Sequence, residues 1–277
     1  MRPAYSPRHR ARSFRWVLGF VSAYLAVLVV LPLGALVCKL GELTRAEVIE
    51  IVLAERTLSA IWLSFRTAAA AALMNAGLGL VVAWVLARME FPGRRWLDAL
   101  IDLPLALPTA VAGIALTTLL TPEGWVGRYF ERWGVQVAFA PLGIAIALTF
   151  VGFPFVVRSI QPIIADLDPD VEEAAHSLGA SRWSTFRRVL WPEIAPALAT
   201  GGLLAFARGL GEYGSVVFIS GNMPYQTEVV PLLIVSELEQ YDSAAAAVLA
   251  TVTLVLALGI TIPANLWLGR LARRGGD

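Results

Sequence analysis

Long uncharged stretches alternate with short charged ones along most of this chain. About 20 consecutive apolar residues are enough for a helix to cross the hydrocarbon core of a bilayer. Six stretches reach or approach that length, and we expect membrane-spanning helices at residues 16–37, 67–87, 103–121, 142–157, 194–210 and within 243–269. The pattern therefore predicts an all-α membrane protein with six transmembrane helices.

Two of these stretches carry residues that affect how a helix packs or continues. Gly77 and Gly79 in the second stretch are expected to let a neighbouring helix approach closely. Pro104 and Pro108 in the third stretch are expected to bend or break that helix. A membrane protein tolerates such a break when neighbouring groups satisfy the freed backbone.

The longest polar break between the expected spans runs from residue 158 to residue 192, and its sequence predicts helix, glycine turn, helix. Asp168 can cap the first helix, with Pro169 at its first position. Gly179 follows that helix, where a left-handed residue is favoured, and Ser181 can cap the second helix. We therefore expect two short helices in this break.

Each of these two predicted helices has an apolar side. On the first helix, helical spacing places the following residues on one face: Val171, Ala174, Ala175 and Leu178. On the second helix, before Pro192 ends it, the apolar residues are Trp183, Phe186 and Leu190. Short amphipathic helices between membrane spans need a surface to pack on. The pattern favours docking on a partner protein, and the alternative is a helix that lies on the bilayer surface.

The same break resembles the loop signature of the permease subunits of bacterial ABC importers. That signature reads E-A-A, three residues, G, nine residues, then I-x-L-P. The matching positions here are Glu173, Ala174, Ala175, Gly179, Val189, Trp191 and Pro192. Val189 stands where the family prefers Ile and Trp191 where it prefers Leu, and both keep the position apolar. The resemblance implies that residues 168–192, here named the signature loop, couple the spans to an ATPase.

Basic residues are distributed unevenly between the two sides of the expected bundle. Fifteen lie in the N-terminal segment, the 88–95 turn, the 158–192 loop and the C-terminal segment, and five lie on the opposite side. Because cytoplasmic segments carry an excess of Lys and Arg, both termini and the signature loop are predicted to be cytoplasmic. The formal net charge of +1 hides this sidedness and gives no indication of a nucleic-acid partner.

The expected spans divide the chain into four segments. The arginine-rich start precedes an apolar stretch with no small-residue cleavage pattern, which favours an uncleaved first helix over a signal peptide. The predicted segments are a cytoplasmic N-terminal segment at 1–15, the first span with an external connector at 16–56, a type I permease domain at 57–268, and a cytoplasmic tail at 269–277.

Composition and rare residues limit the chemistry of the chain. Apolar residues make up 57% of it and charged residues 16%, and the mean hydropathy is +0.69, values typical of a membrane protein. A phosphate-binding P-loop needs Gly-Lys-Ser/Thr, but the single lysine, Lys39, follows Cys38. Cys38 is the only cysteine, and His9 and His176 are far apart in sequence, so no metal site is expected. We expect a transport subunit rather than an enzyme, with no cofactor of its own.

Two pairs of charged residues near the expected spans bear on the function of the chain. Arg208 and Glu212 stand four apart, so on a helix they share a face and can pair. The pair has two interpretations, an ion path or gate and a structural brace. Direct binding of an anionic substrate by Arg208 is less favoured, because Glu212 would compete with the anion. Asp98 and Asp102 are expected to lie at the membrane interface, near a helix N-terminus, without a catalytic role.

Two further stretches resemble the T-type permease subunits of sulfate/thiosulfate importers. They read DALIDLPLALPTAVAG at 98–113 and RGLGEYGSVVFISGN at 208–222. The related molybdate permeases carry a second proline where Thr109 stands. On this resemblance, Pro108 and Thr109 join Arg208 and Glu212 as candidate residues of the translocation path or gate.

The resemblance implies a function and a set of partners. The chain would form half of a transmembrane pathway for sulfate and thiosulfate in the bacterial inner membrane. Its partners would be a second homologous permease, two ATPase subunits that bind ATP and Mg²⁺, an external sulfate-binding protein and membrane lipid. One alternative is a molybdate or tungstate importer. Another is a secondary anion carrier without an ATPase, a class in which internal repeats and midplane charges are more common.

Overall fold

The computed structural model describes residues 7–274 of the chain, and in that range the secondary structure is helical, without β-strands. The elements in chain order are α1 (Pro7–Leu40), α2 (Arg45–Leu53), α3 (Glu55–Arg88), α4 (Arg94–Ile101), α5 (Leu103–Ala106), α6 (Thr109–Leu120), α7 (Gly127–Glu131), α8 (Pro141–Asp166), α9 (Pro169–Ser177), α10 (Arg182–Thr185), the π-helical turn η1 (Phe186–Leu190), α11 (Trp191–Leu210), α12 (Val216–Ile219), α13 (Val230–Glu239) and α14 (Ser243–Arg274). The predicted terminal segments, 1–15 and 269–277, lie partly outside the described residues.

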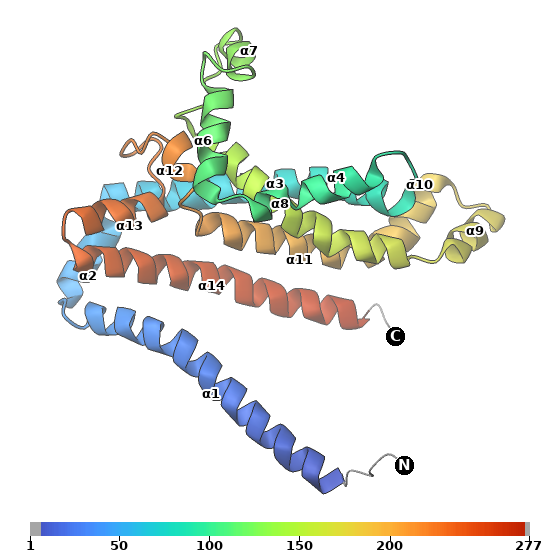
Figure 1. Cartoon of the computed structure of the whole chain (residues 1–277), viewed down its shortest axis with the longest axis horizontal. Helices are drawn as coiled ribbons and strands as arrows, with labels where there is room; N and C mark the ends of the chain where they lie inside the picture. Colours follow the sequence, from blue (N-terminus) through green and yellow to red (C-terminus); the bar gives the residue numbers. More distant parts are fainter. Residues whose placement is uncertain (1–6, 275–277) are drawn as a thin grey trace.

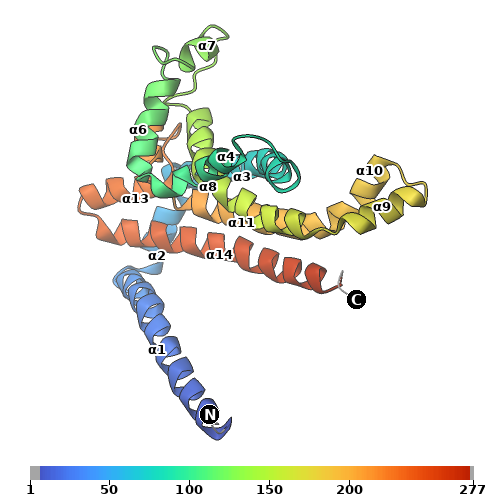
Figure 2. The same cartoon turned by 45° about the vertical axis from the view of Figure 1, so that its right-hand side comes forward.

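Five helical stretches in the described part of the chain are long and apolar enough to cross a membrane. They are Trp16–Leu40, Glu55–Arg88, Pro141–Asp166, Arg182–Leu210 and Ser243–Gly269. These stretches coincide with five of the six predicted spans. In Figure 1, α3, α8, α11 and α14 run lengthwise together, while α1 diverges from them. The signature loop, with α9 and α10, projects from one end of this bundle (Figures 1 and 2).

The third predicted span differs from the other five. Instead of one continuous helix, the chain forms α5 and then α6, and the 12 residues of α6 are too few to cross a bilayer alone. Pro108 disfavours helical backbone at the residue before it, and Leu107 is extended, with ψ 136°. The predicted break is therefore confirmed, and it divides the third stretch into two helical segments. In both views α6 stands at a steep angle to the bundle and carries α7 at its far end (Figures 1 and 2).

The core lies where α3, α8 and α11 cross. Its central buried residues are Ala83, Leu86, Val156, Val157, Ile160, Ile164, Ile194 and Ala205. A Cβ added to Gly79 would lie 2.7 Å from Val156 Cγ1, and one added to Gly201 would lie 2.9 Å from Val156 Cα. Close approach at Gly79 is thus confirmed. Gly77 was predicted to serve the same purpose, and that prediction is wrong, because a Cβ there would meet nothing within 4 Å.

The connector after the first span contains a helix, α2, where no helix was predicted. Thr44 and Glu47 form a capping box at the start of α2. The Glu47 backbone N–H donates to Thr44 Oγ1 at 3.3 Å, and the Thr44 N–H donates to the Glu47 carboxylate at 2.7 Å. Thr-x-x-Glu is a recognised helix-start pattern, so the sequence does contain the signal for α2.

Candidate functional site

The signature loop begins with the predicted cap. Asp168 Oδ1 accepts a hydrogen bond from the Asp170 N–H at 2.9 Å, and Pro169 stands in the first turn of α9. The first turn also carries Asp170 and Glu172, whose negative charges complement the positive end of the helix dipole. The start of α9 is therefore confirmed, and its cause is local in sequence.

Gly179 forms the predicted turn between the two short helices. Its φ is +84°, a left-handed conformation that glycine adopts without a Cβ clash. The turn returns two bonds to α9: the Gly179 N–H donates to His176 O at 2.9 Å, and the Ala180 N–H donates to Ala175 O at 3.0 Å. Ser181 Oγ then accepts from the Ser184 N–H at 3.3 Å, which confirms the second cap. A Cβ on Gly179 would meet nothing within 4 Å in this chain.

Pro192 was predicted to end the second helix, and that prediction is wrong. The backbone stays helical from α10 through η1 into α11, and Pro192 stands in the first turn of α11. Proline lacks an N–H and crowds the carbonyl four residues before it. The π turn widens the spacing at this point, and the Trp191 N–H donates to Phe186 O. The second half of the signature loop is therefore continuous with a membrane-spanning helix.

The signature positions occupy both halves of the loop. Glu173, Ala174 and Ala175 lie on α9, Val189 lies in η1, and Trp191 begins α11 with Pro192. No residue of α9 is buried, and Leu178, just after it, is 89% exposed. The apolar side predicted for α9 is thus left uncovered by the rest of the described chain. Such a surface is suited to a protein partner.

Two arginines connect the loop end of the bundle to distant parts of the chain. Arg88, the last residue of α3, donates from Nη2 to Glu172 Oε1 at 2.8 Å. On α8, Arg158 donates from Nη1 to Asp98 Oδ1 at 2.7 Å and from Nη2 to Asp102 Oδ2 at 2.6 Å. The hydrogen bond from Arg158 is the main reason that the pKa of Asp98 lies below its ordinary value. These bonds hold α4 and α5 against α8.

The sequence did not predict the contact of Arg158 with Asp98 and Asp102. Asp98 and Asp102 were expected near a helix N-terminus. Asp102 is the N-cap residue of α5, as expected, whereas Asp98 lies inside α4. Two carboxylates four residues apart share one face of a helix and repel each other. That arrangement is a signal that a cation lies between them. It does not identify Arg158, which is 56 residues further along the chain.

The predicted pairing of Arg208 and Glu212 is confirmed. Arg208 Nη1 lies 2.7 Å from Glu212 Oε2, and the two side chains are 37% and 2% exposed. Because α11 ends at Leu210, Glu212 lies in the turn beyond the helix. Glu212 Oε1 also accepts from the Ser215 N–H at 2.9 Å and from Ser215 Oγ at 3.0 Å. The buried carboxylate is therefore well provided with donors.

The structure brings the other two candidate path residues to the same place. Pro108 and Thr109 begin α6, and Thr109 Oγ1 packs so closely on Gly214 that a Cβ there would collide with it. We call the group of Pro108, Thr109, Arg208, Glu212 and Ser215 the Arg208–Glu212 junction. It joins the break before α6 to the end of α11. The 20 residues of α11, about 30 Å of helix, separate it from the signature loop.

A fourth charged contact lies at the end of the bundle opposite the signature loop. Arg56, near the start of α3, donates to Glu228 from Nε at 2.8 Å and from Nη2 at 2.6 Å. Its Nη1 donates to Glu237 of α13 at 3.3 Å. The partners are 172 and 181 residues away in sequence, and no local pattern predicts them.

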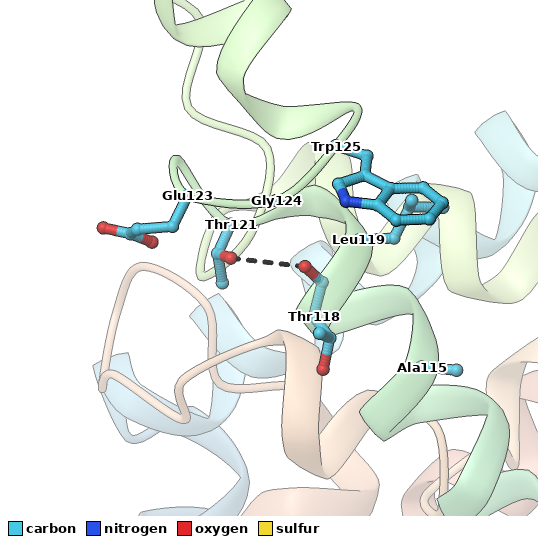
Figure 3. Close-up of a pocket in the computed structure, with 7 residues that line it drawn as sticks. All are labelled: Ala115, Thr118, Leu119, Thr121, Glu123, Gly124 and Trp125. Atoms are coloured by element: carbon cyan, nitrogen blue, oxygen red, sulfur yellow. Dashed lines mark hydrogen bonds between the residues drawn. The ribbon is translucent and has the colours of Figure 1, made fainter.

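A pocket of about 510 Å³ lies at the far end of α6, at the turn that follows it. Figure 3 shows Trp125 beside Leu119, Glu123 directed away from both, and the bond from Thr121 Oγ1 to Thr118 O. Glu123 is the one charged residue among those lining it. A carboxylate repels an anion, so this pocket is a poor candidate for an oxyanion site.

Three comparisons with known proteins bear on this arrangement. A family model described as "Binding-protein-dependent transport system inner membrane component" matches residues 75–275. The "Probable sulfate transport system permease protein cysT" of Nephroselmis olivacea is 47% identical over 258 residues, 93% of this chain and 90% of that protein. The "Sulfate transport system permease protein CysT" of Escherichia coli (strain K12) is 41% identical over 271 residues, 98% of both chains.

Solved structures share the fold at low sequence identity. A chain from the crystal structure of a bacterial ABC transporter involved in the import of the acidic polysaccharide alginate aligns with a TM-score of 0.76 at 17% identity, covering 95% of this chain and 96% of that chain. A chain from inward-facing MetNI, a methionine ABC transporter, aligns with a TM-score of 0.54 at 17% identity, covering 78% of this chain and 94% of that chain.

Proposed function

Since this chain belongs to the family of binding-protein-dependent transport system inner membrane components, we propose that it is the permease subunit of an ABC importer for sulfate and thiosulfate. It forms one half of the transmembrane pathway. The observation that carries the proposal is the uncovered signature loop: α9 exposes its apolar side at one end of the bundle, while the other half of the loop continues into α11. The substrate follows from near full-length relatives whose names specify sulfate transport.

The partners follow from the same reasoning. A second homologous permease completes the pathway, two ATPase subunits dock at the signature loops, and an external sulfate-binding protein delivers the anion. ATP and Mg²⁺ bind to the ATPase subunits, and this chain acts as a transport subunit rather than an enzyme. Its apolar outer surface faces membrane lipid. The excess of basic residues on the side of the signature loop supports an inner-membrane topology with both termini in the cytoplasm.

The coupling residues act by contact. Glu173, Ala174 and Ala175 lie on the exposed helix, and Gly179 forms the turn that sets the angle between the two halves of the loop. When the ATPase subunits close, they push on this rigid element, and the continuous helix behind it transmits the displacement toward the Arg208–Glu212 junction.

At the Arg208–Glu212 junction the two opposite charges balance. A neutral pair whose carboxylate is already bonded by Ser215 is a poor high-affinity site for a dianion. The junction is better suited to a gate or brace that joins α6 to α11, and selection of sulfate falls mainly to the external binding protein.

The test is uptake of labelled sulfate into vesicles that hold the complete complex. We expect sulfate uptake to require ATP on the side of the membrane that carries the signature loop and sulfate-loaded binding protein on the opposite side. Molybdate should compete only weakly with sulfate for uptake. Strong inhibition by molybdate would identify the molybdate importer instead. Uptake by the chain without its ATPase would identify a secondary anion carrier.

A further inference from the structure

The signature loop contacts the end of α3 as well as continuing into α11. Coupling through α11 alone gives no role to this contact. Arg88 Nη2 lies 2.8 Å from Glu172 Oε1, and the two side chains are only 21% and 28% exposed. Glu172 directly precedes the first signature residue, Glu173. The ion pair therefore joins the exposed helix α9 to the end of a different membrane-spanning helix, 84 residues earlier in the chain.

A second contact joins the same end of α3 to the other half of the loop. The guanidinium of Arg88 lies 5.8 Å from the centre of the Trp84 ring. Trp84 in turn packs edge-on against Phe186 of η1, with ring centres 6.0 Å apart. Arg88 and Trp84 together contact both α9 and η1, so a displacement of the loop must move them or break these contacts.

The opposite end of α3 is also held by charge. Arg56 is bonded to Glu228 at 2.6 Å and to Glu237 at 3.3 Å. Between Arg56 and Arg88 the helix is continuous, and its 34 residues span about 50 Å. One rigid helix thus connects the signature loop at one end with α13 and the segment before it at the other.

Within this helix, polar atoms lack partners. Asn75 is fully buried, and neither its Nδ2 nor its Oδ1 is hydrogen-bonded. The Nε of Arg88 is also buried without a partner. Among the described residues, all the buried side-chain atoms left unsatisfied in this way belong to α3. Buried polar atoms without a partner are unfavourable, so these positions on α3 are less firmly held than its apolar contacts.

From these contacts we propose that Arg88 is a positioning residue, through which motion of the signature loop passes into α3. The proposal rests on the proposed function, in which the loop docks the ATPase. In one transport state Arg88 holds α9 as seen here. In the other state α3 shifts along α8 and α11, and the bond between Arg88 and Glu172 breaks. The shift then reaches Glu228 and Glu237 through Arg56.

The experiment uses the complete complex in vesicles and compares Arg88→Gln, Glu172→Gln and the charge-exchanged double variant Arg88→Glu/Glu172→Arg. Sulfate uptake is measured per ATPase subunit retained in the purified complex. We expect each single variant to lower this ratio about ten-fold, within the usual range for coupling between sites. The exchanged pair should recover most of it. Arg95→Gln, an exposed change in the same 88–95 turn, is the matched control and should leave uptake unchanged.

Normal uptake per retained ATPase in both single variants would overturn the proposal. So would a loss of uptake that parallels loss of the ATPase itself, because Arg88 would then only shape the docking surface. If the unaltered complex shows no ATP-driven sulfate uptake, the proposed function fails instead, and that outcome is distinct from a functioning complex in which Arg88 can be replaced freely.

Discussion

The signature loop and the Arg208–Glu212 junction lie near opposite ends of α11, yet they are stabilised in different ways. The loop is shaped by backbone caps and a glycine turn, and its side chains remain largely exposed. The junction is shaped by a buried carboxylate, which Arg208 and Ser215 hold from two sides. A substitution in the loop should therefore act mainly on what docks there. A substitution at the junction should act first on the stability of the chain.

The largest effect that this contrast predicts is that of Gly179→Asp. Aspartate must adopt a left-handed angle and adds a charge at the proposed docking surface. Sulfate uptake by the complete complex should fall to background while the amount of protein in the membrane stays near normal. Normal uptake by this variant would show that the loop is not the coupling element.

Gly179→Ala separates the two causes of that loss. Because a Cβ at this position meets nothing within 4 Å in the chain, the cost within the subunit is the backbone angle alone, about 1–2 kcal/mol. A thermal unfolding measurement on the purified subunit should show only that modest change. Any further loss of uptake must arise from contact with the partner.

The second effect concerns the buried carboxylate. Arg208→Ala leaves the buried Glu212 carboxylate charged and without its cation. Because Arg208 itself is 37% exposed and water can reach the site, the cost should fall below the about 3–5 kcal/mol of a fully buried pair. The double variant Arg208→Ala/Glu212→Gln removes the charge and can still accept from Ser215, so it should be more stable than the single variant. Melting temperature and membrane abundance report the difference. Equal stability with equal loss of uptake would favour a direct role for Arg208 in moving the anion.

A smaller effect is expected where α3 packs closely on α8, at Gly79 but not at Gly77. Gly79→Ala forces a Cβ onto Val156 and should destabilise the chain by about 1–3 kcal/mol. Gly77→Ala, two residues earlier on the same helix, meets nothing and serves as the control. Thermal unfolding of both variants in the same detergent gives the comparison, and equal stabilities would contradict the packing described for α3 and α8.

The smallest functional effect is expected from a labelling variant. Ser181→Cys, made in a Cys38→Ala background, keeps a small side chain at this exposed position and only weakens its cap on α10, so transport should fall slightly. An impermeant thiol reagent should label it only in inverted membranes, as the uneven distribution of arginines predicts. Labelling in intact cells would reverse the topology and separate the loop from any cytoplasmic ATPase.

The features that the sequence predicts well are those whose cause is local. The Asp168 cap, the Gly179 turn and the Arg208–Glu212 pair each depend on residues at most five positions apart. Helix breaks at prolines are equally local, although Pro192 shows that a proline's effect depends on the turn before it. There a π turn absorbs the proline, and the helix continues.

The features that the sequence does not reveal join distant parts of the chain. Arg158 meets its aspartates across 56 and 60 residues, Arg88 meets Glu172 across 84, and Arg56 meets Glu228 across 172. From the sequence alone, each arginine could pair with any of several carboxylates. Only the packing of α3, α8 and the loops selects one of them, and that packing depends on the whole core.

The divergence of α1 from the bundle has a consequence for biosynthesis. Its described side chains, residues 16–40, are almost all exposed, and its main packing contact is with α14. A ribosome makes α1 before the other helices and makes α14 after all of them. During nearly the whole of translation, α1 must therefore remain in the bilayer without its main neighbour. The apolar part of α1 has the highest mean hydropathy of the five candidate spans. This hydropathy stabilises α1 in lipid before α14 has been made.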